Sequence, residues 1–213
     1  MVLSGSSIEL IDGDTNSINI NIIEDLLNQV KTTIEGKEFN TVSILGVQSS
    51  GKSSLLNNMF NLNFAITGAR TTKGVHMRLL QSPDGKKVYM LMDTEGLRSL
   101  EQMNVTKSKQ MNNDNRLATF VIGIADICIV NLKEFDHSHL TPILQMVAKS
   151  FLKFKQNQWV PNVHSIFFHQ KMENRSMVND VGAQGNKMIA ELNKVNTTYS
   201  ISTKNRKWVI LGL

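Results

Sequence analysis

The stretch "GVQSSGKSSLL", residues 46–56, sets glycines at both ends of a polar loop and follows the second glycine with Lys52 and Ser53. From Gly46 to Ser53 the spacing is G-x-x-x-x-G-K-[ST], the pattern of a phosphate-binding loop. The β-branched run at 40–47 predicts a buried strand before the loop, and the apolar residues after Ser53 predict a helix. An ordinary glycine turn would not need this strand–loop–helix context, so the sequence favours a phosphate cradle.

The residue types of this loop suit the chemistry of a triphosphate. Glycines let successive backbone N–H groups turn inward toward phosphate oxygens, and the start of the following helix adds partial positive charge. We expect the Lys52 ammonium to reach the β- and γ-phosphates and the Ser53 hydroxyl to bind Mg²⁺.

A second motif, "YMLMDTEGL" at 89–97, supplies the carboxylate that a magnesium site needs. Asp93 ends an apolar predicted strand, and Gly96 follows three residues later, so that its backbone N–H is expected near the γ-phosphate. Between the two motifs lies "ARTTKG", in which Thr71 or Thr72 is a candidate to complete the metal shell. We favour Thr72, and the predicted Mg²⁺ ligands are therefore Ser53, Thr72 and Asp93.

Predicted strands and helices alternate along the chain, and the strands are continuous apolar runs. This pattern favours an α/β fold of the P-loop NTPase type, with a mostly parallel sheet, one antiparallel edge strand and helices on both faces. Residues 1–20 are polar and turn-rich. The predicted strands are 40–47, 75–81, 86–93, 126–132 and 162–170, and the predicted helices are 20–36, 52–60, 113–125, 138–156 and 176–195.

Five segments carry a family resemblance: "LGVQSSGKSSLLNNMF", "FAITGARTTKGVHMRLL", "DTEGLRS", "DNRLATFVIGIADICIVNLK" and "FFHQK". Over residues 40–195 the chain resembles the GTP-binding domain of the interferon-inducible very large GTPases. It is more distantly similar to guanylate-binding proteins and atlastin-like, dynamin-related GTPases.

The resemblance implies a large-GTPase domain that binds GTP or GDP with Mg²⁺ and forms a nucleotide-dependent homodimer. It also implies that Thr72, Asp93 and Gly96 are switch residues. Where the very large GTPases have "HQN" after the strand, this chain has His169-Gln170-Lys171, so Gln170 and Lys171 are the candidates for facing the base, with Glu173 or Asp180 as candidate acceptors. The catalytic candidates are Ser50, Lys52, Thr72 and Gly96. The loop residues expected at the nucleotide are Gly46, Gln48, Ser49, Ser50, Gly51, Lys52, Ser53 and Ser54.

Two features keep alternatives open. Leu97 stands where small Ras-like GTPases carry a glutamine that orients water, and the loop stretch Gln48–Ser50 lacks the arginine that guanylate-binding proteins have there. A nucleotide-binding interaction module with negligible hydrolysis is therefore an alternative to a GTPase. A P-loop ATPase or kinase is a third reading, although neither a lid nor an acceptor site is evident in the sequence.

The bulk properties set the remaining expectations. The 213 residues favour one domain, and the net charge of +5 is spread without a dense basic run, which argues against a nucleic-acid partner. A single cysteine and the lack of a signal or membrane-spanning stretch favour a cytoplasmic location, with the nucleus as an alternative. We expect an N-terminal segment at 1–38 with one amphipathic helix, a GTPase domain at 39–195 that is incomplete at its C-terminal end, and a divergent, disordered tail at 196–213.

Overall fold

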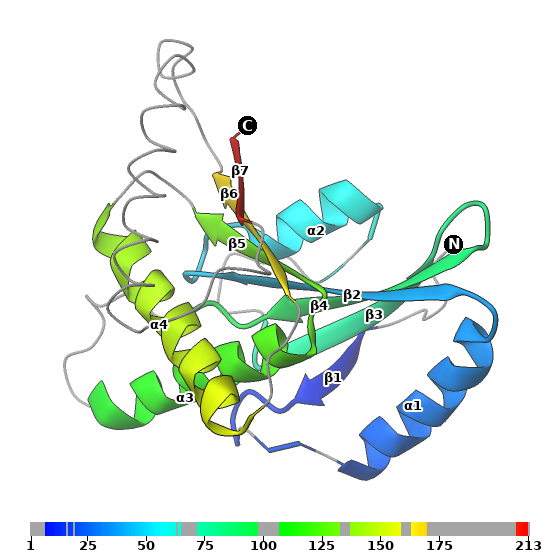
Figure 1. Ribbon diagram of the computed structural model, residues 1–213, viewed down its shortest axis with the longest axis horizontal. Helices are drawn as coiled ribbons and strands as arrows, with labels where there is room; N and C mark the ends of the chain where they lie inside the picture. Colours follow the sequence, from blue (N-terminus) through cyan, green and yellow to red (C-terminus); the bar gives the residue numbers. More distant parts are fainter. Residues whose placement is uncertain are drawn as a thin grey trace.

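A seven-stranded sheet forms the centre of the protein in the computed structural model (Figure 1). The structure describes residues 7–15, 17–18, 20–62, 64, 72–97, 107–132, 137–158, 163–169 and 208–212. Strand order across the sheet is β1-β3-β4-β2-β5-β6-β7. The strands are β1 (Ile8–Ile11), β2 (Glu38–Gly46), β3 (Val75–Gln81), β4 (Lys87–Thr94), β5 (Ile127–Leu132), β6 (His164–His169) and β7 (Trp208–Gly212).

Helices cover both faces of this sheet, which gives three layers (Figure 1). The helices are α1 (Ile20–Ile34), α2 (Lys52–Phe60), α3 (Lys107–Ile124) and α4 (His137–Gln156). Leu55 and Leu56 of α2 pack with Ile44 and Leu91 in one apolar cluster. A larger cluster on the opposite face joins the buried side chains of α1, α3 and α4 to the sheet. None of the described helices combines the length and the hydrophobicity that a membrane crossing requires.

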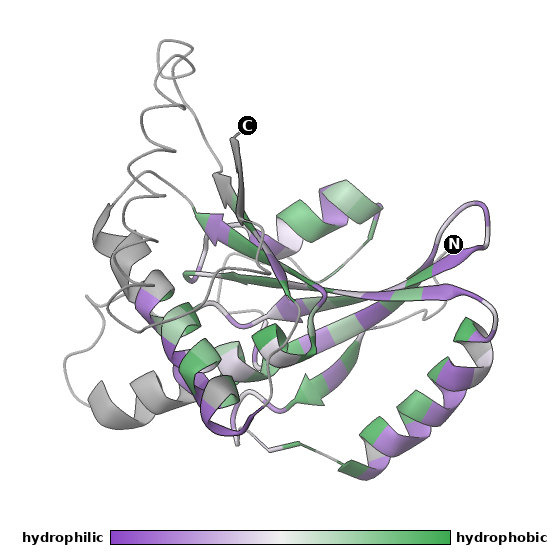
Figure 2. Ribbon diagram, viewed as in Figure 1, coloured by the Kyte–Doolittle hydropathy of each residue, from purple (hydrophilic) through white to green (hydrophobic). Residues whose placement is uncertain are grey.

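The strands that lead to the predicted loops lie at the centre of the sheet and run parallel. β2 pairs in parallel with β4 on one side and with β5 on the other, and both neighbours are rich in hydrophobic residues (Figure 2). Because the carboxyl ends of neighbouring parallel strands meet at one edge, the loops after β2 and β4 lie side by side. The predicted α/β fold with a mostly parallel sheet is confirmed.

The antiparallel edge is larger than predicted. β3 pairs antiparallel with β4, as the turn at 82–86 led us to expect, but β1 adds a further antiparallel strand outside β3. The polar, turn-rich sequence of residues 1–20 does not predict this four-residue strand. Its strand geometry comes from pairing with residues 75–77, far away in the sequence, and a local pattern does not report such a contact.

Two further elements differ from the predicted ranges. Within the predicted tail at 196–213, Trp208–Gly212 forms β7, which pairs in parallel with β6, so a last strand exists where we expected none. Helix α3 begins at Lys107, six residues before the predicted start at 113, because "KSKQMN" is polar but made of residues compatible with a helix. The predicted helix at 176–195 lies outside the described residues.

Candidate nucleotide-binding site

The loop at 46–51 leaves the end of β2 and turns sharply into α2. Two residues take the left-handed backbone conformation, Ser49 with a φ of 60° and Gly51, the residue before the helix, with a φ of 82°. Glycine adopts this conformation without a steric penalty, which explains the second glycine of the motif. α2 then begins at Lys52, so the N–H groups of its first turn, which have no acceptor within the helix, lie at the loop.

Lys52 is enclosed within the loop. Its side chain is buried, and its Nζ donates a hydrogen bond to the carbonyl oxygen of Val47 at 3.1 Å. Burial lowers the pKa of Lys52 to about 8, although the negative charges of Asp93 and Glu95 act in the opposite direction. An ammonium group with so little contact with water is a strong partner for an anionic ligand that enters the loop.

Ser53, Thr72 and Asp93 meet although they come from three separate segments. The Ser53 hydroxyl donates to Asp93 Oδ2 at 2.6 Å, and the Thr72 hydroxyl donates to the same oxygen at 3.2 Å. The two hydroxyl oxygens are 3.4 Å apart. The structure thus brings together the three residues that we predicted as Mg²⁺ ligands.

The carboxylate of Asp93 has capacity for a further partner. Among the described residues its Oδ1 is buried and has no hydrogen-bond partner. Burial raises the pKa of Asp93, and this effect exceeds the opposing effects of Ser53, Lys52 and Thr72. A buried carboxylate oxygen of this kind is a natural ligand for a hard cation.

The donor set fits Mg²⁺ better than a transition metal. Two hydroxyls and one carboxylate are oxygen donors, and Mg²⁺ is commonly held by one or two carboxylates together with waters and substrate phosphates. Within the described ranges there is no group of three His, Cys, Asp or Glu side chains that would hold a metal ion.

The segment after Asp93 is tied to the phosphate loop by backbone hydrogen bonds. Leu97 N–H donates to the Gly46 carbonyl at 3.0 Å, and Gln48 N–H donates to the Leu97 carbonyl at 2.8 Å. Gly96 lies against Gln48 so closely that a Cβ on Gly96 would be 2.3 Å from Gln48 Cα. The two motifs therefore form one continuous backbone surface beside Lys52.

Asn131, near the end of β5, anchors the phosphate loop, and the sequence analysis did not identify it as a site residue. Its side-chain amide donates to the Ser50 carbonyl at 2.8 Å and to Ser50 Oγ at 3.2 Å. Asn131 is fully buried, and its backbone carbonyl oxygen would lie 2.3 Å from a Cβ on Gly46. This close contact explains why the first residue of the motif is glycine. In the sequence Asn131 only interrupts an apolar run, and its polar character there was the one available signal.

Several predicted residues cannot be placed at this site. Gln170 and Lys171, the candidates for facing the base, lie outside the described residues. Ser54 lies within the first turn of α2 and is half-buried. The described part of the site thus comprises the phosphate loop, the predicted metal ligands and the glycine of the second motif.

Comparison with known proteins agrees with this geometry. A family model described as "URGCP-like GTPase domain" matches residues 1–210. The chain belongs to this family. This URGCP-like GTPase domain is 35% identical over 178 residues to human interferon-induced very large GTPase 1, covering 81% of the chain and 7% of the human protein. The predicted family resemblance is confirmed.

The chain is also similar to other curated proteins, and in each case it covers only a small part of the relative. Bovine up-regulator of cell proliferation is 28% identical over 194 residues, which is 88% of the chain and 19% of that protein. Protein ROOT HAIR DEFECTIVE 3 from rice is 34% identical over 131 residues, which is 59% of the chain and 15% of that protein. The chain therefore spans a small part of the relatives it matches.

Solved structures support the fold. The crystal structure of a dimerization-deficient mutant of Toc33 from Arabidopsis thaliana matches with a TM-score of 0.53 at 11% identity, covering 95% of the chain and 83% of that structure. At this identity the match concerns the arrangement of strands and helices alone.

Proposed function

We propose that this URGCP-like GTPase domain binds GTP together with Mg²⁺ and hydrolyses it to GDP and phosphate. One observation carries the proposal. The oxygens of Ser53, Thr72 and Asp93 converge within 3.4 Å of one another, directly beside a buried lysine in a phosphate-binding loop.

Each part of the site has a distinct role in this proposal. The loop amides and the Lys52 ammonium bind the β- and γ-phosphates, and Gly96 presents its N–H to the γ-phosphate. Ser53, Thr72 and Asp93 hold Mg²⁺, which, when bound, neutralises the charge that develops on the phosphate oxygens. Asn131 keeps Ser50 and the loop in place through its two hydrogen bonds.

Guanine specificity is the part of the proposal that rests on the family. Gln170 and Lys171 follow β6 at the position where the base is expected, and we propose them as the residues that face it. A comparison of GTP with ATP tests this assignment separately from the phosphate site.

The rate of hydrolysis depends on Leu97. Its side chain is buried and 3% exposed, so it packs in the core and offers no group to orient the attacking water. We therefore propose slow turnover by the isolated domain and faster turnover in a nucleotide-dependent homodimer, because a charged group from a second copy can stabilise the transition state. The proposed location of the protein is the cytoplasm, which the single cysteine favours.

The binding proposal is tested by titrating the domain into fluorescent GTP, GDP and ATP analogues, with Mg²⁺ or with EDTA. Wild-type protein is expected to bind the GTP analogue most tightly in Mg²⁺. Lys31→Ala serves as the matched control for Lys52→Ala, because Lys31 is an exposed lysine in the last turn of α1. Tight binding should persist in the control and be lost in Lys52→Ala.

The possible results separate the parts of the proposal. Equal affinity of Lys52→Ala and wild type would contradict the phosphate site, and a preference for ATP would contradict the guanine assignment alone. Single-turnover hydrolysis at increasing protein concentration tests the homodimer. A rate constant independent of concentration would favour a monomeric enzyme, and no hydrolysis at any concentration would favour the interaction module.

A further inference from the structure

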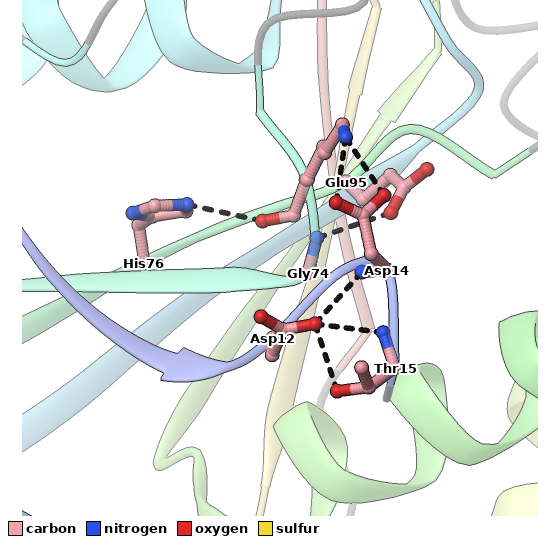
Figure 3. Close-up of polar contacts among 7 residues, drawn as sticks. Asp12, Asp14, Thr15, Gly74, His76 and Glu95 are labelled. Atoms are coloured by element: carbon pink, nitrogen blue, oxygen red, sulfur yellow. Dashed lines mark hydrogen bonds and ion pairs between the residues drawn. The ribbon is translucent and has the colours of Figure 1, made fainter. Parts of the chain in front are cut away.

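Gly74, two residues after Thr72, donates its N–H to the Glu95 side chain, and the turn that contains Asp12, Asp14 and Thr15 lies nearby (Figure 3). Gly74 lies between the side chain of Glu95 and the turn after β1. The Lys73 carbonyl is 3.0 Å from the imidazole Nε2 of His76. Because Thr72 is joined directly to this segment, whatever fixes Lys73 and Gly74 also limits where the Thr72 hydroxyl can lie.

Glu95 holds Gly74 through its backbone and its side chain. The Glu95 N–H donates to the Gly74 carbonyl at 2.7 Å, and the Gly74 N–H donates to Glu95 Oε2 at 3.0 Å. Glu95 is also only two residues after Asp93, the carboxylate that accepts the Thr72 hydroxyl. Glu95 therefore links the chain segments of two proposed metal ligands.

On the other side of Gly74 lies a compact turn at residues 12–15. Asp12 Oδ1 accepts hydrogen bonds from the Asp14 N–H at 3.0 Å, the Thr15 N–H at 2.7 Å and the Thr15 hydroxyl at 2.8 Å. The hydrogen bonds from Thr15 lower the pKa of Asp12, so its carboxylate is ionised at neutral pH and the turn keeps its form. Both carboxylate oxygens of Asp14 accept from Lys73 Nζ, at 2.7 and 2.8 Å.

The turn and Gly74 touch at the level of the backbone. A Cβ on Gly13 would lie 2.4 Å from the Gly74 nitrogen, and a Cβ on Gly74 would lie 1.9 Å from the Ile11 carbonyl oxygen. Gly74 also has a φ of 66°, which favours glycine. Only a pair of glycines permits this close contact.

We propose that Glu95 and the turn at 12–15 act as positioning elements for Thr72. They clamp Gly74 between them, so that the Thr72 hydroxyl already lies on Asp93 before Mg²⁺·GTP binds. The N-terminal segment, which precedes the phosphate loop by more than thirty residues, thereby becomes part of the apparatus that senses the nucleotide. This inference rests on the proposed Mg²⁺·GTP function.

A positioning role predicts an effect that depends on the nucleotide. In GTPases the switch segments are ordered by contacts of the γ-phosphate and Mg²⁺ and are released after hydrolysis. Loss of the clamp should therefore weaken binding of a non-hydrolysable GTP analogue and leave GDP binding unchanged. A general loss of fold would weaken both nucleotides.

The central test compares Glu95→Ala with Glu95→Gln in Mg²⁺, with affinities measured for the GTP analogue and for GDP. Glutamine keeps an oxygen that accepts the Gly74 N–H, whereas alanine removes it. We expect Glu95→Ala to lose about fivefold to tenfold in affinity for the GTP analogue, the loss of about one hydrogen bond. GDP affinity should stay within about twofold, and Glu95→Gln should restore the affinity for the GTP analogue.

Three results would overturn the inference. Glu95→Gln as weak as Glu95→Ala would show that Glu95 acts through its charge, which influences Lys52. Equal losses for GTP analogue and GDP would show a merely structural role, and unchanged affinity in Glu95→Ala would show no role at all. If instead wild-type protein binds no GTP analogue in Mg²⁺, the proposed function itself fails.

The contribution of the N-terminal turn is tested by Gly13→Ala, with Gly36→Ala as control. A Cβ on Gly13 crowds Gly74, whereas a Cβ on Gly36 meets nothing within 4 Å. Because Gly36 has a φ of 72°, Gly36→Ala strains the backbone after α1 without touching Gly74, and it therefore controls for a general loss of stability. We expect Gly13→Ala to reduce affinity for the GTP analogue about fivefold with GDP affinity retained, and Gly36→Ala to change the ratio of the two affinities by less than twofold. The same ratio in both variants would refute the role of the turn.

Discussion

Replacement of Asp93 by asparagine should stabilise the nucleotide-free protein and at the same time abolish its response to Mg²⁺·GTP. In the structure the Asp93 carboxylate is buried, with one oxygen shared by two hydroxyls and the other without a partner among the described residues. Without a cation, its charge is therefore poorly compensated. Asparagine has nearly the same shape and can still accept hydrogen bonds, but it carries no charge to desolvate.

The magnitudes follow from these contacts. An unsatisfied buried polar group costs about 1–3 kcal/mol, and more when it is charged. In a domain of this size 1 kcal/mol shifts Tm by about 2–4 °C, so the Tm of Asp93→Asn without nucleotide should exceed that of wild type by about 2–12 °C. Ligand at about 100 times its Kd stabilises the wild type by about 2.7 kcal/mol, or about 5–10 °C, and the variant should lose this shift.

The difference in Tm between Asp93→Asn and wild type should also depend on pH. Burial raises the folded-state pKa of Asp93 above the ordinary value of 3.8, so the folded state binds the proton more tightly than the unfolded state. The destabilising effect of Asp93 therefore grows as the pH rises above 3.8 and is complete above the folded-state pKa. The Tm difference between variant and wild type should shrink when the pH is lowered toward 4.

Thermal denaturation in EDTA and in Mg²⁺·GTP, at several pH values, measures both effects. Asp84→Asn is the matched control, because Asp84 is an exposed aspartate in the turn between β3 and β4 that accepts hydrogen bonds from Ser82 and Lys86, and its pKa is lowered. That control should keep the full nucleotide shift. A lower Tm for Asp93→Asn than for wild type in EDTA would refute the reasoning on burial, and a retained nucleotide shift would refute the metal role.

Three further predictions concern the phosphate loop. Lys52→Ala should weaken binding of fluorescent GTP about 100-fold or more, because a charged donor to two phosphates is lost. The affinity of the wild-type protein should fall as the pH rises through about 8, because Lys52, whose pKa is lowered to about 8, then loses its proton. Asn131→Ala should lower the Tm by about 4–12 °C in thermal denaturation, since its two buried hydrogen bonds to Ser50 are together worth about 2–3 kcal/mol; an unchanged Tm would contradict this anchor. Gly96→Ala should fold but bind the GTP analogue at least tenfold more weakly in the same titration, because the new methyl group pushes against the backbone of Gln48; wild-type affinity would show that the two segments separate easily.

The residues at the phosphate site could be predicted because their signals are local. Gly46, Gly51 and Lys52 follow a fixed spacing that the backbone of the loop itself requires, and the predicted strand and helix on either side were found there. Asp93 was recognisable as a carboxylate at the end of an apolar strand. Parallel pairing of β2 with β4 then brings the two motifs together, as the predicted α/β fold implies.

The missed features depend on contacts between distant segments. Asn131 anchors the loop only because β5 lies beside β2, and nothing in its neighbours indicates that partner. β1 and β7 are four and five residues long, and each is a strand because it pairs with a neighbour far away in sequence. Glu95 lies in the second motif between Asp93 and Gly96, but the motif assigns roles only to the aspartate and the glycine. The contact of Glu95 with Gly74 is not evident from the sequence.

The pairing of β2 with β4 has a consequence for insertions and deletions in this family. Ser43 pairs with Met92, and the Thr94 hydroxyl donates to the Ile44 carbonyl at 2.6 Å, which locks the alignment of the two strands. Losing a single amino acid from β4 would carry the Asp93 carboxylate about 3.3 Å along the sheet and turn it toward the opposite helical layer. We therefore expect the turn at 82–86 to tolerate changes in length, whereas the eight residues of β4 that follow it should not change in number.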